Sequence, residues 1–120
     1  MKNVTLVIGA STNPNRYSNI AIKRLIDKNL PVRALGLRKG KVGNVVVDDE
    51  KLDYENIDTV TLYLNSKRQE NYYNYIIGLK PRRVIFNPGT ENIEFVQLLQ
   101  ESNIEAEIAC TLVLLSTNQY

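Results

Sequence analysis

Histidine is absent from the 120 residues of this chain, and Cys110 is the single cysteine. Because histidine is the commonest general base and the commonest metal ligand, its absence removes the usual means of acid–base and metal chemistry. A single cysteine can form neither a disulfide within the chain nor a thiolate metal site, and it is typical of a reducing compartment. The sequence therefore gives little support to a metal centre or to nucleophilic catalysis.

Long apolar runs are also missing, and the longest ones are far shorter than a membrane span. The first three residues lead directly into a strand-like run without the pattern of a signal peptide, so we expect a cytoplasmic protein. The 15 Lys and Arg residues against 13 Asp and Glu give a formal net charge of +2, which is too small to indicate nucleic acid as a partner. The acidic run 48–50 has no companion ligand and is expected to be a solvated turn rather than a metal site.

Apolar residues recur at intervals that predict alternating strands and helices. Strands are expected at residues 3–8, 31–37, 57–64, 83–86 and 104–108, and residues 45–47 form either an edge strand or an extended connection. Helices are expected at residues 17–28, 67–79 and 91–102, while the apolar segment 109–115 covers either the edge of the core or the partner in a homodimer. Since parallel neighbours need crossover connections, this order predicts a single α/β domain over residues 1–120, with a doubly wound parallel sheet of about five strands and helices on both faces.

Three finer expectations concern the ends and faces of these elements. Ser66 is expected to cap the helix 67–79, and Cys110 to be a buried small side chain near the end of the core. Four apolar side chains of the helix 91–102 are expected to face the core: Ile93, Val96, Leu98 and Leu99.

The turn from Gly9 to Ser18 connects the first strand to the first helix, and its residue types suit a phosphorylated ligand. Gly9 can adopt backbone angles closed to other residues and lets a ligand approach the main chain. Ser11, Thr12 and Ser18 offer hydroxyls. Arg16 adds a cation, and the helix start offers unpaired N–H groups at the positive end of its dipole. The alternative interpretation is a tight turn that needs glycine for its geometry alone.

A second, basic turn follows the strand 31–37 and contains Arg38, Lys39 and Lys41. Ligands of open parallel sheets bind beyond the carboxyl ends of the strands, where the turns after adjacent strands lie together. An NAD site usually has an acidic residue in this turn, whereas a positive residue suits a phosphate on the ribose. The turn therefore argues against NAD and favours NADP or another ligand with a ribose phosphate. A nicotinamide dinucleotide is weakly supported, because only Gly9 of the G-x-G-x-x-G glycines is present.

The first turn, Gly9-Ala10-Ser11-x-x-Pro14-x-Arg16-x-Ser18, resembles the G-A-S-x-x-P-x-R-x-S signature of the small CoA-binding domain proteins. These are single Rossmann-like domains similar to the CoA-binding part of the succinyl-CoA synthetase alpha subunit. The resemblance extends over nearly the whole chain, including the segments 35–40, 86–92 and 110–112.

This resemblance implies coenzyme A as the ligand, with its pyrophosphate at the first turn and its adenosine end near the second. Phosphate contacts would come from Gly9, Ala10, Ser11, Arg16 and Ser18, and the phosphate-bearing adenosine end would meet Arg38 or Lys39. The path of the pantetheine arm would be lined by Asn65, Pro88 and Gly89. The synthetase's phosphorylated histidine has no counterpart in this chain, so the ligase chemistry that uses it is excluded.

The sequence therefore favours non-catalytic binding of CoA or an acyl-CoA, because no nucleophile–base pair is visible. Two alternatives stay open. One is a small enzyme that uses NADP or an acyl-CoA. The other is an interaction module with a decayed nucleotide pocket, since Leu35-Gly36-Leu37 stands where the family has a V-N-P-type turn. Obstruction of the pocket by the side chains of Leu37 or Pro88 would support that second alternative.

Overall fold

The computed structural model describes residues 2–120. A 7-stranded sheet contains β1 (Val4–Ala10), β2 (Val32–Gly36), β3 (Gly40–Val42), β4 (Val45–Asp48), β5 (Ile57–Leu62), β6 (Arg83–Phe86) and β7 (Glu105–Ile108). The helices are α1 (Tyr17–Asp27), α2 (Ser66–Gln69), the 3₁₀ turn η1 (Glu70–Tyr72), α3 (Tyr73–Leu79), α4 (Ile93–Glu101) and α5 (Thr111–Ser116).

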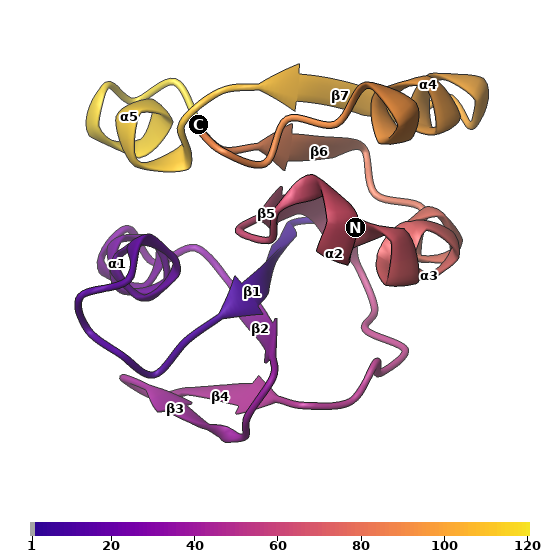
Figure 1. Cartoon of the computed structure of the whole chain (residues 1–120). Helices are drawn as coiled ribbons and strands as arrows, with labels where there is room; N and C mark the ends of the chain where they lie inside the picture. Colours follow the sequence, from indigo (N-terminus) through magenta and orange to yellow (C-terminus); the bar gives the residue numbers. More distant parts are fainter. Residues whose placement is uncertain (1) are drawn as a thin grey trace.

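The strands lie in the order β3-β4-β2-β1-β5-β6-β7, and every neighbouring pair is parallel except β3 with β4. Figure 1 shows them stacked from β3 at the bottom to β7 at the top, with α1 and α5 on one side and α3 and α4 on the other. The prediction of a doubly wound, mostly parallel α/β sheet is thus confirmed. The strand number of about five was too low, because residues 40–42 and 45–48 form two further strands, β3 and β4, which pair as an antiparallel hairpin.

The short strand β3 escaped prediction because it is hidden within the basic turn. Its residues 40–42 contain a single apolar side chain, Val42, so they show no alternation from which a strand could be recognised. Gly43 turns the chain with a φ of +59°, and β4 then returns antiparallel to β3. The basic segment therefore has two parts: residues 37–39 form a loop, and residues 40–42 form the first strand of a hairpin.

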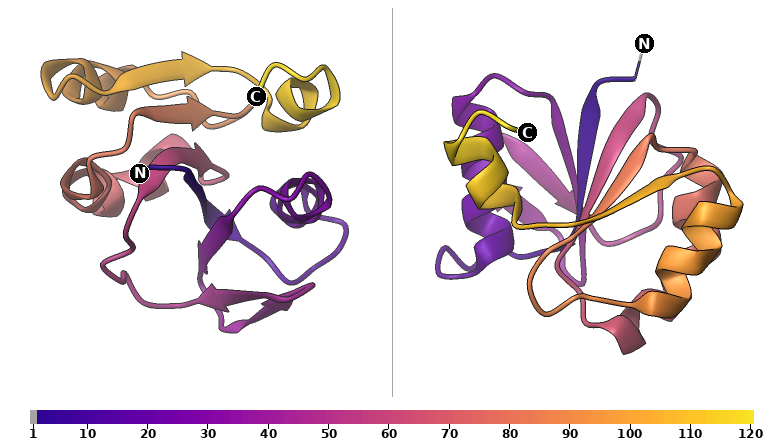
Figure 2. Two further views of the ribbon diagram at one scale, coloured as in Figure 1. Left: turned by 180° about the vertical axis from the view of Figure 1, so that it is seen from behind. Right: turned by 90° about the horizontal axis from the view of Figure 1, so that it is seen from above.

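Two apolar cores cover the two faces of the sheet. The face under α1 and α5 buries Val7, Ile22, Leu25 and Leu115, and the two helices lie side by side in both views of Figure 2. On the opposite face, side chains of the central strands pack against α3 and α4. The strands contribute Leu6, Ile8, Val84 and Phe86, and α4 contributes Phe95 and Leu99.

The predicted inner face of α4 needs correction. Leu99 is buried, and Val96 and Leu98 pack against the core, but Ile93 is 78% exposed. Phe95 is the buried anchor of the helix, stacked on Tyr73 with ring centroids 4.4 Å apart. Ile93 precedes Phe95 by two positions, which places it about 200° away around the helix axis, on the outer side of α4.

The predicted helix 67–79 is divided into α2, η1 and α3. Its cap is Asn65 rather than Ser66, because the Asn65 side chain accepts a hydrogen bond from the Arg68 N–H at 3.0 Å. Cys110 also differs from its prediction: it is partly exposed, at the cap position of α5. Within residues 2–120, no helix is long and apolar enough to cross a membrane.

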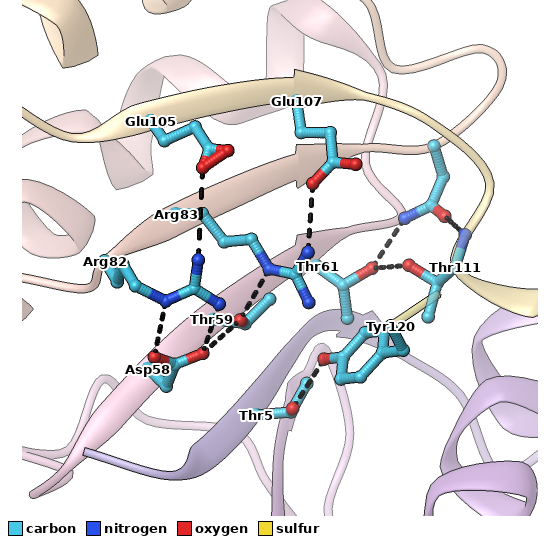
Figure 3. A network of polar contacts seen from close by, with 11 residues as sticks. Thr5, Asp58, Thr59, Thr61, Arg82, Arg83, Glu105, Glu107, Thr111 and Tyr120 are labelled. Carbon is cyan, nitrogen blue, oxygen red and sulfur yellow. Dashed lines mark hydrogen bonds and ion pairs between the residues drawn. The ribbon is translucent and has the colours of Figure 1, made fainter. Parts of the chain in front are cut away.

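Beyond α5, polar side chains cover the sheet on the same side (Figure 3). Arg83 is buried, and its guanidinium donates to Thr59 Oγ1 at 2.9 Å and to Glu107 at 3.0 Å. The ring of Tyr120 lies over this guanidinium at 4.7 Å, and its hydroxyl is 2.6 Å from Thr5 Oγ1. This network satisfies a buried charge and ties the last residue to β1, so we assign it a structural role.

Candidate ligand-binding site

The loops after β1, β2, β5 and β6 surround a pocket of about 690 Å³ at the carboxyl edge of the sheet. Strand order reverses between β1 and β5, which is the place where open α/β sheets bind ligands. Of the site residues predicted from the sequence, Lys39 does not line this pocket. The others do: Gly9, Ala10, Ser11, Arg16, Ser18, Arg38, Asn65, Pro88 and Gly89. The structure therefore brings together residues that lie at or just after the ends of four separate strands.

Close backbone contacts fix the floor of the pocket. Gly9 has a φ of +90°, and a Cβ there would lie 2.9 Å from the carbonyl carbon of Tyr63. Gly36 is equally restricted, because a Cβ on it would lie 2.2 Å from the carbonyl oxygen of Ala10. β1 can therefore approach β2 and the end of β5 only with glycine at these two positions.

The loop between β1 and α1 is held by its own polar groups. The Asn13 N–H donates to Ser11 Oγ at 3.1 Å, and the Asn15 N–H donates to Asn13 Oδ1 at 3.0 Å. The buried Asn19 donates from its side chain to the Ser11 carbonyl at 2.9 Å, which anchors the loop to α1. These hydrogen bonds hold the loop in place at the carboxyl end of β1.

The start of α1 faces this loop with unpaired donors. Arg16 stands at the cap position, and its side chain makes no capping hydrogen bond. Within residues 2–120, no acceptor is found for the N–H groups of Tyr17 and Ser18. There is also no acidic side chain in the first turn to neutralise the positive end of the helix. An anion bound here would meet unpaired N–H groups, the helix dipole and the cation of Arg16.

The second turn lies beside the first loop. A Cβ on Gly40 would lie 2.5 Å from Thr12 Cγ2, so β3 begins in contact with the loop after β1. Arg38 lines the pocket, whereas Lys39 is exposed and does not line it. Leu37 and Pro88 are both exposed and line the pocket without filling it.

Sequence reasoning missed several residues of the pocket, among them Arg68, Tyr63 and Tyr72. Arg68 follows the strand ending at residue 62, and this position after a strand was the signal that could have identified it. The sequence instead predicts a helix over residues 67–79, with Arg68 at its beginning. Burial raises the pKa of the Tyr63 phenol to about 12, so this buried hydroxyl stays protonated.

The charge of the pocket has one sign. Arg16, Arg38 and Arg68 line it, and no Asp or Glu side chain does so. The ion pairs found in residues 2–120 instead join Arg82 and Arg83 to acidic residues near the start of β5 and in β7. Unpaired guanidiniums around a hollow without acids favour a ligand with several negative charges.

A second hollow, of about 940 Å³, lies at the amino end of β2 and differs in charge. Asp48 and Asp53 line it, and Asp48 accepts a hydrogen bond from the Tyr54 hydroxyl at 2.5 Å. Arg33 also lines it, so its charges are mixed, and it suits an anionic ligand less well than the pocket in which arginines are the only charged lining residues. In residues 2–120, no group of three or more His, Cys, Asp or Glu side chains is placed to hold a metal ion.

The sheet order, the covering helices and the pocket at the strand reversal define a Rossmann-like α/β domain. Residues 3–116 match the family described as "CoA binding domain". The chain therefore belongs to the CoA-binding domain family, as its sequence motif predicted.

Solved structures agree with this fold. A crystal structure of an uncharacterized protein shares 44% identity with a TM-score of 0.95, over 100% of this chain and 99% of that one. A protein from Thermus thermophilus shares 16% identity with a TM-score of 0.86, over 99% and 91%. A hypothetical protein from Pyrococcus horikoshii OT3 shares 26% identity with a TM-score of 0.80, over 93% and 80%. A search of curated proteins gives no match for this chain.

Proposed function

We propose that the protein binds coenzyme A or an acyl-CoA in the pocket at the carboxyl edge of the sheet, and that it does so without catalysis. Membership of the CoA-binding domain family supports CoA as the ligand in general. The observation that carries the proposal for this chain is the pocket itself, which contains arginines from three loops and no carboxylate. CoA carries a diphosphate and a ribose phosphate, so its charge complements this lining.

The positions of the cations suggest how the ligand would lie. The diphosphate would bind at the start of α1, where Arg16 and the N–H groups of Tyr17 and Ser18 face the pocket. The ribose phosphate would bind Arg38 after β2 rather than Lys39, because Lys39 does not line the pocket. The pantetheine arm would then run across β5 towards Pro88 and Gly89.

The lining of the pocket also supports the absence of catalysis. It contains hydroxyls from serine, threonine and tyrosine, but no carboxylate, cysteine or lysine that could act as a base or as an activated nucleophile. The phenol of Tyr63 has a pKa raised to about 12 by burial, which makes it a poor base near neutral pH. We therefore assign the pocket to binding rather than to a reaction.

Calorimetric titration with CoA and with dephospho-CoA tests this proposal. CoA should bind more tightly than dephospho-CoA by about tenfold, the effect of one charge-assisted contact to the ribose phosphate. Arg38→Gln should remove this preference, while Lys39→Gln serves as a matched control and should leave it unchanged. NADP tests the dinucleotide alternative. Absence of binding by CoA would refute the proposal, and tighter binding of NADP than of CoA would replace it.

A further inference from the structure

Arginines follow three neighbouring strands of the sheet, and each lines the pocket. Arg38 follows β2, Arg16 follows β1, and Arg68 follows β5, in the order in which these strands lie side by side. The function proposed above assigns the first two to the phosphates of CoA. Arg68 is left at the opposite end of the row, on the side of the pantetheine arm.

The position of Arg68 is fixed by buried polar contacts of its neighbours. Gln69 is fully buried, and its side chain donates to the Leu64 carbonyl at 2.8 Å and to the Thr90 carbonyl at 2.7 Å. Asn92 donates to Gln69 Oε1 at 3.0 Å, so α2 is fastened to the loops after both β5 and β6. Because the Arg68 N–H is held by Asn65, the side chain starts from a fixed point above the pocket.

The guanidinium of Arg68 has no acidic partner among residues 2–120. Near it, Leu64, Tyr72 and Pro88 line the pocket with apolar or aromatic groups, as suits the uncharged arm of the ligand. The loop after β6 brings no anion into the pocket either, since Glu91 accepts a hydrogen bond from the Gly89 N–H and does not line the pocket. An anion at the end of the ligand could therefore bind this guanidinium without displacing a partner of the protein.

We propose that Arg68 selects CoA thioesters whose acyl group ends in a carboxylate. This inference rests on the proposed function, because it assumes that the diphosphate and the ribose phosphate lie at Arg16 and Arg38. The acyl carboxylate would then accept hydrogen bonds from the Arg68 guanidinium beyond the apolar part of the pocket. Arg68 is thus a specificity-determining residue for the ligand class of dicarboxylic acyl-CoA thioesters.

The test compares two thioesters of nearly the same shape by calorimetric titration. Malonyl-CoA carries the carboxylate, and isovaleryl-CoA has an uncharged isopropyl group in its place. The ratio of their affinities should fall about tenfold in Arg68→Gln relative to the wild type. Arg38→Gln is the matched control, because it should weaken both thioesters equally and leave the ratio unchanged. Thermal denaturation of each variant checks that it is folded, as expected for an exposed side chain.

Two results would overturn the inference while leaving CoA binding intact. One is an unchanged ratio in Arg68→Gln. The other is an equal loss of affinity for CoA and both thioesters, which would place Arg68 on the phosphates instead. A wild-type protein that binds neither CoA nor either thioester would contradict the proposed function itself, and the inference with it.

Discussion

Single glycines determine how closely the strands around the pocket can approach one another. Gly9 combines a left-handed φ of +90° with a Cβ position 2.9 Å from the Tyr63 backbone, so two independent constraints forbid a side chain there. Gly89 also has a positive φ, of +89°, but nothing lies within 4 Å of its Cβ position. The glycine of the sequence motif, Gly9, is therefore the one at which the structure has no room for a side chain, whereas there is room for one at Gly89.

Gly9→Ala should lower the free energy of unfolding by about 1–3 kcal/mol, because the new Cβ is both strained and obstructed. Gly78→Ala is the matched control: Gly78 lies in α3, and its Cβ position meets nothing within 4 Å. Alanine there should be neutral or stabilising by up to about 1 kcal/mol, since it favours a helix over glycine. Urea denaturation measures both, and equal effects of the two substitutions would refute this account of Gly9.

The glycine turn and Arg16 could be predicted because their signals are local: a strand, a glycine, hydroxyls and a helix start follow one another within a few residues. Arg68 could not be predicted in the same way. Its place depends on Gln69, whose partner at Thr90 is 21 residues away, and no local pattern reveals that contact. The pairing of Gly36 with Ala10 is likewise a contact between strands that the sequence alone does not show.

Strands and helices were predicted well where an apolar run had a clear beginning and end. Residues 83–86 form β6 with the predicted bounds, and the strand and helix at 57–62 and 17–27 are close to theirs. Prediction failed where tertiary contacts override local pattern: β3 exists because it pairs with β4, and α2 is separated from α3 because Gln69 turns inward. The fold class thus follows from the sequence, while the edges of the sheet and the walls of the pocket depend on packing.

The beginnings of β5 and β6 are joined by an ion pair that should make stability depend on pH. Arg82 donates to Asp58 at 2.9 Å and 3.0 Å, and this bond holds the pKa of the Asp58 carboxyl below its ordinary value of 3.8. Since the folded state favours the carboxylate, the contribution is complete above the ordinary pKa and is lost as the pH falls through the folded one.

Arg82→Gln should therefore lower the free energy of unfolding by about 0.2–1 kcal/mol at neutral pH, the range for an exposed pair. At about pH 2 the difference from the wild type should shrink, because Asp58 becomes protonated. Urea denaturation at the two pH values measures the change. A difference that is as large in acid as at neutral pH would show that Arg82 acts through packing rather than charge.

Viewed as a whole, the molecule separates its charges by location. Three acidic side chains, those of Asp58, Glu105 and Glu107, pair with arginines near the start of β5 and in β7, and Asp48 and Asp53 line the hollow at the amino end of β2. The pocket at the carboxyl edge holds only cations among its charged groups. A net charge of +2 conceals this separation, so composition could not have located the ligand site.

The most direct test of the account is a titration of the ¹⁵N-labelled protein with CoA, followed by NMR shifts of the backbone amides. We predict the largest shifts at Ser11 to Ser18 and at Leu37 and Arg38, which border the proposed phosphate sites. Amides of the hollow at the amino end of β2, such as those of Asp53 and Tyr54, should stay unchanged. Shifts confined to that hollow, or no shifts at saturating CoA, would contradict the central claim.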